Sequence, residues 1–189
     1  MKKIVLTFGL IAGVILAAMQ LLTLPFQDEL GFDRGQIVGY TIMLVAFLLI
    51  FFGIRSYRDN VAGGTVRFGR ALVVGLLIAA VASACYAAAW QVYYFNFAPD
   101  FMTKYQAHVL EKARANGESA EAIAKRKAEM DSFAKMYENP AVNFSITFLE
   151  PLPVALVVSL VSAGVLSRRR KAWTEHGDVI RNPDASGTR

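Results

Sequence analysis

Glu150 is the residue whose type and position could carry chemistry, because it is the one acidic residue inside an apolar stretch. It lies in Phe148–Val154, next to Pro151 and close to Pro153. Ionisable side chains are costly in lipid and mark functional sites by default. The carboxyl group could bind a proton, a cation or a cationic headgroup. The alternative is structural, with Glu150 fixing its helix to neighbouring helices through one polar contact.

The depth of Glu150 depends on where its helix begins, and two starting points fit the sequence. A helix that begins near Phe144 places Glu150 about 9 Å along its axis. A helix with Pro151 as its first residue places Glu150 at the outer boundary, beside the positive helix end. Pro151 and Pro153 have no backbone N–H, so a structural kink is expected there. Both starting points remain open at the level of sequence.

Other polar residues of the apolar stretches are candidate partners of Glu150. A buried carboxylate without a partner favours its neutral form. The sequence offers five candidate hydrogen-bond donors: Gln20, Trp90, Gln91, Tyr93 and Tyr94. We select Gln20, Trp90 and Gln91, together with Glu150, as a hypothetical binding site.

The chain lacks the side chains that most enzymes require. Its two histidines, His108 and His176, fall on opposite sides of the expected membrane, so no paired-histidine metal motif is possible. Serines inside the apolar stretches have no histidine at membrane depth to activate them. We therefore expect no catalytic residue, no metal and no cofactor. A lipid-directed enzyme would need Glu150 and a first-loop acid, namely Asp28, Glu29 or Asp33.

Four stretches are long and apolar enough to cross a bilayer as helices: residues 4–24, 36–54, 70–95 and 144–166. Apolar residues make up 55% of the 189-residue chain, and its mean hydropathy is +0.40. These values predict an all-α polytopic membrane protein with one transmembrane domain, residues 1–171. The first stretch exceeds a signal-peptide core and lacks a good cleavage site, so we expect an uncleaved helix. Glycine and alanine recur in the first and third stretches, which favours close helix packing.

Basic residues predict the orientation of these helices. They gather at the N-terminus, in the loop after the second stretch and after the fourth: Lys2, Lys3, Arg55, Arg58, Arg67, Arg70, Arg168 and Arg169. With four spans these segments share one side, which the positive-inside rule makes cytoplasmic. The arginines are expected to anchor the helix ends at anionic headgroups. Membrane topology thus explains the net charge of +5 better than binding of nucleic acid.

The loop at residues 98–142 is predicted to form a helical hairpin on the outer side. Pro99-Asp100 is a good helix start, Asn116-Gly117 a good stop, and a second helix is expected over Ser119–Tyr137 before Asn139-Pro140. The hairpin either packs on itself and on the membrane surface or caps a binding site for a ligand or partner. Residues 172–189 are polar and lack periodicity, which is typical of a disordered tail.

Several segments carry a family resemblance: Gly9–Gly13, Gly53–Asp59, Arg67–Leu72, Pro99–Tyr105 and Phe148–Val154. In this order and with these gaps, they resemble the DUF4199 family of small bacterial membrane proteins with four helices, whose function is uncharacterised. The resemblance covers about residues 5–171 and implies a fold and a topology but no activity. Pro151 is an additional proline relative to the family's usual pattern, which favours a kink or a late helix start.

Two functions follow as hypotheses. The first is a non-enzymatic protein of the bacterial cytoplasmic membrane, with an accessory or structural role, lipids as partners, and assembly with itself or another membrane protein. The alternative is a small oligomeric transporter or ion-coupled subunit that uses Glu150, with Gln20 and Gln91 along its path.

Overall fold

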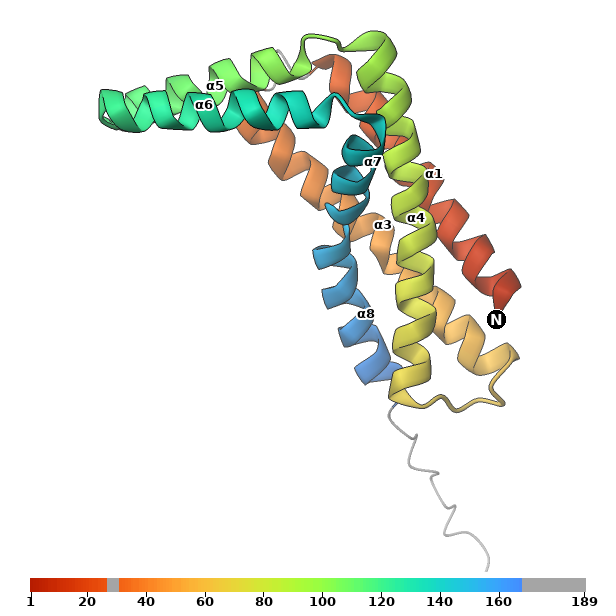
Figure 1. Cartoon of the computed structure of the whole chain (residues 1–189). Helices are drawn as coiled ribbons and strands as arrows, with labels where there is room; N and C mark the ends of the chain where they lie inside the picture. The colour runs from red at the N-terminus through yellow and green to blue at the C-terminus, as the bar shows by residue number, and fades with distance from the viewer. Residues whose placement is uncertain (27–30, 168–189) are drawn as a thin grey trace, which may run out of the picture.

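Each of the four apolar stretches forms helix long enough to cross a bilayer in the computed structural model, which describes residues 1–26 and 31–167 (Figure 1). The first three are α1 (Lys2–Thr23), α3 (Phe32–Asn60) and α4 (Phe68–Phe97), and the short 3-10 helix η1 (Leu24–Phe26) follows α1. The fourth consists of α7 (Pro140–Leu149) and α8 (Leu152–Leu166). No strand occurs in the part of the chain that the structure describes. The architecture is that of a multi-pass, all-helical membrane protein.

Two helices begin earlier than the sequence predicted. Helix α3 starts at Phe32 rather than at residue 36, because its first turns carry polar residues that a hydropathy criterion excludes. Helix α7 starts at Pro140 rather than near Phe144, because the Asn139 side chain caps it, accepting from the N–H of Ala141 at 2.9 Å. The fourth span therefore begins before both proposed starting points, but its second helix, α8, begins at Leu152 with Pro151 as N-cap, within one residue of the second proposal.

The helix is interrupted at Glu150 and Pro151. Glu150 is the C-cap residue of α7, and the next helix, α8, begins at Leu152. Proline has no N–H to donate to the carbonyl four residues earlier, so Pro151 and Pro153 leave the carbonyls of Thr147 and Leu149 without their helical partners. The ten residues of α7 place Glu150 about 15 Å from the start of the helix.

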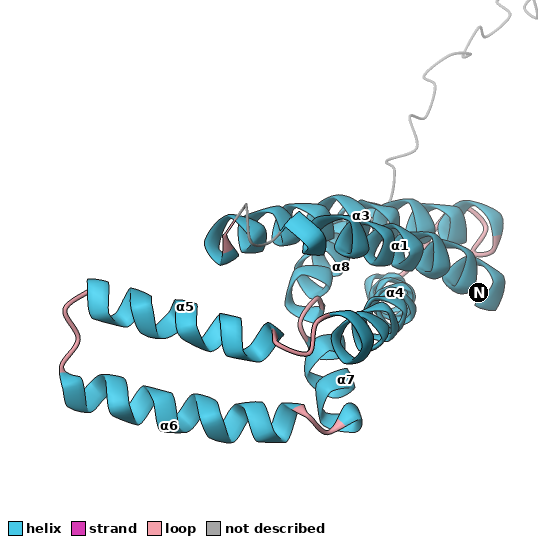
Figure 2. Cartoon of the chain, turned by 90° about the horizontal axis from the view of Figure 1, so that it is seen from above, coloured by secondary structure: helices cyan, strands magenta, loops and turns pink. Residues whose placement is uncertain are grey.

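The segment between α4 and α7 forms a hairpin of two helices, α5 (Phe101–Ala115) and α6 (Ala120–Tyr137), as the sequence predicted. Gly117 adopts φ +74° in the turn, a conformation that side chains disfavour. The hydroxyl of Ser119 caps α6 by accepting from the N–H of Ala122 at 3.2 Å. The hairpin projects sideways from one end of the bundle (Figures 1 and 2).

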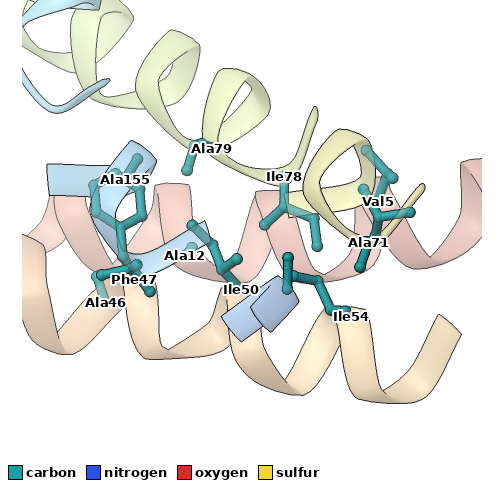
Figure 3. Close-up of a cluster of buried hydrophobic side chains, with 14 of the residues drawn as sticks. Val5, Ala12, Ala46, Phe47, Ile50, Ile54, Ala71, Ile78, Ala79 and Ala155 are labelled. Atoms are coloured by element: carbon teal, nitrogen blue, oxygen red, sulfur yellow. The ribbon is translucent and has the colours of Figure 1, made fainter. Parts of the chain in front are cut away.

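A closely packed core fills the other end of the bundle. Phe47, Ile50 and Ile54 of α3 and Ile78 of α4 are fully buried there (Figure 3). Helices α1 and α4 approach most closely at glycine: a Cβ added to Gly13 would lie 2.6 Å from the Cβ of Cys85. Small residues thus allow the close backbone contact that the sequence predicted.

The N-terminus and the turn between α3 and α4 lie at the end of the bundle away from the hairpin (Figure 1). Arg55 and Arg58 on α3 both pair with Asp59, at 3.7 and 2.7 Å. Arg67 and Arg70 are exposed at the start of α4. Arg168, Arg169 and the tail at residues 172–189 lie outside the described residues, so the predictions made for them stay predictions.

The packing of α5 against α6 in the hairpin is expected to depend on pH through the carboxyl group of Asp131. Hydrogen bonds from Lys127 at 2.7 Å and Gln106 at 2.6 Å lower the pKa of this carboxyl below its ordinary value of 3.8. Because this pKa is lower in the folded protein than in the unfolded chain, the ionised carboxylate stabilises the folded state at pH values above 3.8. This contribution to the unfolding free energy is lost as the pH falls through the lowered pKa. Spin labels at Glu111 and Lys125 should show a broader distance distribution below pH 3.8 than at pH 6. Asp131→Asn should remove that difference; an unchanged difference would assign it to another group.

Candidate functional site

A cavity of about 650 Å³ lies between the α5–α6 hairpin and the adjoining end of the bundle. Helix α5 forms one wall, and the first turns of α3 form another. The ends of α1 and α4 and the junction of α7 with α8 complete it. Leu16 and Met43 line the cavity and also belong to the buried core, so they form its floor. The volume is within the range of small-molecule sites, about 300–1,000 Å³.

Contacts between α5 and the start of α3 hold the hairpin over the cavity. The ring of Phe32 lies 5.5 Å from that of Tyr105 and 5.2 Å from that of His108, measured between centroids. The Nζ of Lys112 donates to Asp33 at 2.8 Å. This ion pair is exposed and contributes little to stability by itself. The aromatic contacts therefore provide most of the interaction between α5 and the start of α3.

A second aromatic cluster fixes the hairpin to α4 and α7. The indole N–H of Trp90 donates to the hydroxyl of Tyr137 at 2.9 Å, and this hydroxyl lies 3.1 Å from the Oγ1 of Thr147. Burial raises the pKa of Tyr137, so its hydroxyl stays protonated and can donate as well as accept. Phe101 packs edge-on against Trp90, with centroids 4.9 Å apart. Three helices thus meet at one buried hydroxyl group.

Removing this hydroxyl should destabilise the protein. Tyr137→Phe leaves the buried N–H of Trp90 without an acceptor, which is expected to lower the unfolding free energy by about 1–3 kcal/mol. Thermal unfolding in detergent measures the loss. Tyr93→Phe is the matched control, because no hydrogen bond of the Tyr93 hydroxyl is present among the described residues. Equal losses in the two variants would contradict the assigned role of Tyr137.

Glu150 lines the cavity from the junction of α7 and α8. Its Oε2 accepts a hydrogen bond from the hydroxyl of Tyr86 at 3.3 Å. Tyr86 is therefore the donor, in place of the five candidates that the sequence suggested. Eleven residues separate Tyr86 from Phe97, so this contact lies about 16 Å below that end of α4.

The other residues of the hypothetical binding site fall in two places. Gln20 and Trp90 line the cavity with Glu150. The Oε1 of Gln20 is buried and has no hydrogen-bond partner among the described residues. Gln91 does not line the cavity; its Nε2 donates to the carbonyl of Pro140 at 2.8 Å and to Asn143 at 3.0 Å. Gln91 thus joins α4 to α7.

The acidic residues on the cavity wall differ in whether a basic side chain pairs with them. Asp33 pairs with Lys112 and lies 3.5 Å from the Nε2 of His108, while Glu118 pairs with Arg126 at 3.0 Å. Glu150 has no cationic partner among the residues that the structure describes. Asp33 has no contact with Glu150, whereas Asp28 and Glu29 lie outside the described residues. Over the same part of the chain, no group of three metal-ligating side chains occurs.

Sequence reasoning missed several residues of the cavity wall. Gln36 and Tyr40 lie on the first turns of α3, inside the second predicted span, and Tyr86 is an aromatic residue in the third. The signal for Gln36 and Tyr40 was present, since both sit near the start of a span, where polar and aromatic residues gather. No local signal marks Tyr86, because its partner is 64 residues away.

The comparison with family models decides the family. The model described as "Protein of unknown function (DUF4199)" matches residues 7–168. The chain belongs to the DUF4199 family. No curated protein and no solved structure matches it. The match begins inside α1 and extends past the end of α8, so it includes the hairpin and the whole cavity wall of this DUF4199 protein.

Proposed function

We propose that this DUF4199 protein is a non-enzymatic protein of the bacterial cytoplasmic membrane that binds a small molecule or a lipid in the cavity under its hairpin. The observation that carries the proposal is a cavity of about 650 Å³ whose wall includes the carboxylate of Glu150, which has no cationic partner among the described residues. Both termini are on the cytoplasmic side, and the hairpin is on the outer side. Membrane lipids, a second copy or another membrane protein cover the apolar outer faces.

The packed core supports binding rather than passage through the bundle. Leu16 and Met43 close the cavity, and beyond them Phe47 and Ile50 are fully buried. The position of the arginines supports the orientation. The N-terminus and the turn between α3 and α4 lie at the end of the bundle away from the hairpin (Figure 1). Arg55 precedes this turn near the end of α3, and Arg67 lies next to the start of α4.

Cavity filling tests the proposed binding. A Cβ added to Gly39, which lines the cavity, would meet no atom within 4 Å, and the same holds for Gly69 at the exposed start of α4. We expect native mass spectrometry of the wild type to detect a retained molecule. Gly39→Leu should lose it, and Gly69→Leu should keep it. Retention by Gly39→Leu, or no retained molecule in the wild type, would contradict binding in this cavity.

Labelling tests the orientation. In a Cys85→Ala background, cysteines at Asn116 in the hairpin and at Thr65 between α3 and α4 should react with an impermeant maleimide in intact cells to different extents. We expect labelling at residue 116 and protection at residue 65 until the cells are opened. The reverse result would place the hairpin in the cytoplasm.

A further inference from the structure

The charge pairing on the cavity wall points to the kind of molecule that the cavity holds. Asp33 and Glu118 already have basic partners, and these pairs lie at the hairpin side. Glu150 lies further along the fourth span, about 15 Å from its start, where the residue is exposed and lines the cavity. Glu150 has no basic partner among the described residues, so a ligand that covers it should carry a positive charge, because burying an uncompensated charge is costly.

Aromatic rings surround the same part of the cavity. Tyr86 donates to Glu150, while Tyr40 and Trp90 line the adjoining walls on α3 and α4. The faces of such rings attract cations, with Trp the strongest. Leu16, Met43 and Ile146 also line the cavity, so a ligand that fills it must present apolar surface to them.

We propose that the cavity binds a lipophilic cation, whose positive group lies at Glu150 among the aromatic rings and whose apolar body fills the space beneath α5. This inference rests on the proposed function and names its ligand class. An anion would face the carboxylate, and a sugar would place hydroxyl groups against Leu16, Met43 and Ile146, which offer them no hydrogen-bond partner. Two sources fit: the amine headgroup of a lipid, or a free hydrophobic cation.

Binding of tetraphenylphosphonium to the full-length protein in phosphatidylglycerol nanodiscs tests the proposal. Tetraphenylborate has nearly the same size and shape and the opposite charge. We expect saturable binding of the phosphonium, above empty nanodiscs, and at least tenfold weaker binding of the borate. Glu150→Gln should weaken phosphonium binding at least about tenfold, as expected for loss of one close charge pair. Glu129→Gln, the same change on the exposed face of α6, should leave binding unchanged.

The variants separate failure of the ligand class from failure of the cavity. If both probes bind equally and Gly39→Leu abolishes this binding while Gly69→Leu does not, the cavity is a binding site but the proposed cationic ligand class is wrong. Binding that survives Gly39→Leu would overturn both. If Glu150→Gln fails to fold, the comparison of the two probes on the wild type still decides the charge preference.

A second arm identifies the source of the cation. Replacing half of the phosphatidylglycerol by phosphatidylethanolamine introduces an amine headgroup without changing the protein. Competition by this lipid, seen as phosphonium binding that weakens in the wild type but not in Glu150→Gln, assigns the site to a headgroup. Unchanged binding assigns it to a free hydrophobic cation. In both cases phosphonium binding must still depend on Glu150, or the proposal is wrong.

Discussion

Gly13→Ala is expected to destabilise the bundle by about 1–3 kcal/mol, because it overpacks the contact between α1 and α4. The added Cβ would lie 2.6 Å from the Cβ of Cys85 and 2.9 Å from its Sγ. It would also lie 3.3 Å from the Cα of Ala82, so the backbone of α4 must move as well. The intrinsic helix preference runs the other way, since alanine is favoured over glycine by about 1 kcal/mol. Tertiary packing therefore decides the sign.

Thermal unfolding in detergent measures this effect, and two further variants control it. Gly164→Ala makes the same change in α8 where the new Cβ meets no atom within 4 Å, so we expect no loss of stability. Cys85→Gly removes both close atoms and should restore part of the stability in the double variant with Gly13→Ala. A double-mutant cycle without coupling would show that the helices do not meet at this pair.

The contact at Gly13 also positions the cavity. Gly9 makes a second close approach on the same face, where an added Cβ would lie 2.7 Å from the Cβ of Val81. Together these contacts fix α1 against α4, and the next turns of the two helices carry Gln20, Tyr86 and Trp90 into the cavity wall. A shift of α1 away from α4 would therefore alter the wall as well as the core.

The helices could be predicted from the sequence because their signals are local. The spans follow from runs of apolar residues, and the hairpin follows from turn and capping residues such as Gly117 and Ser119. The errors occurred where a local signal has two meanings. Asn139-Pro140 ends α6, but it is also a cap and first residue for α7, which extends the fourth span by one turn. Polar residues in the first turn of α3 similarly concealed its start.

The cavity could not be predicted, because it depends on contacts between residues far apart in the chain. The sequence marks Glu150 as the one acid inside an apolar stretch, yet nothing in the segment around Tyr86 marks that residue as its hydrogen-bond donor. The fold-back of α5 onto α3 depends on Phe32 meeting Tyr105, and neither residue indicates this contact in its own segment. Amphipathic patterns show that a helix face is buried, but they do not identify what buries it.

Phe47→Ala is expected to lower the unfolding free energy by about 2 kcal/mol, which is less than the loss of about 3–5 kcal/mol typical of soluble cores. Phe47 is fully buried at the centre of the core, where it lies near Ala155 (Figure 3). In a bilayer, the side chain leaves the core for lipid rather than for water, so the hydrophobic transfer term is small. The remaining cost is a cavity on the order of 100 Å³, at about 24 cal/mol per Å³.

Phe52→Ala provides the matched control, because Phe52 lies on the same helix and is 50% exposed. If lipid covers its ring, truncation exchanges one lipid contact for another and stability should be nearly unchanged. Unfolding by a denaturing detergent, followed by circular dichroism, gives both values on one scale. A loss for Phe52→Ala as large as that for Phe47→Ala would contradict the lipid-facing assignment. The outward face of α3 would then be packed against protein, which would make a second copy of this chain or another membrane protein part of the folded unit.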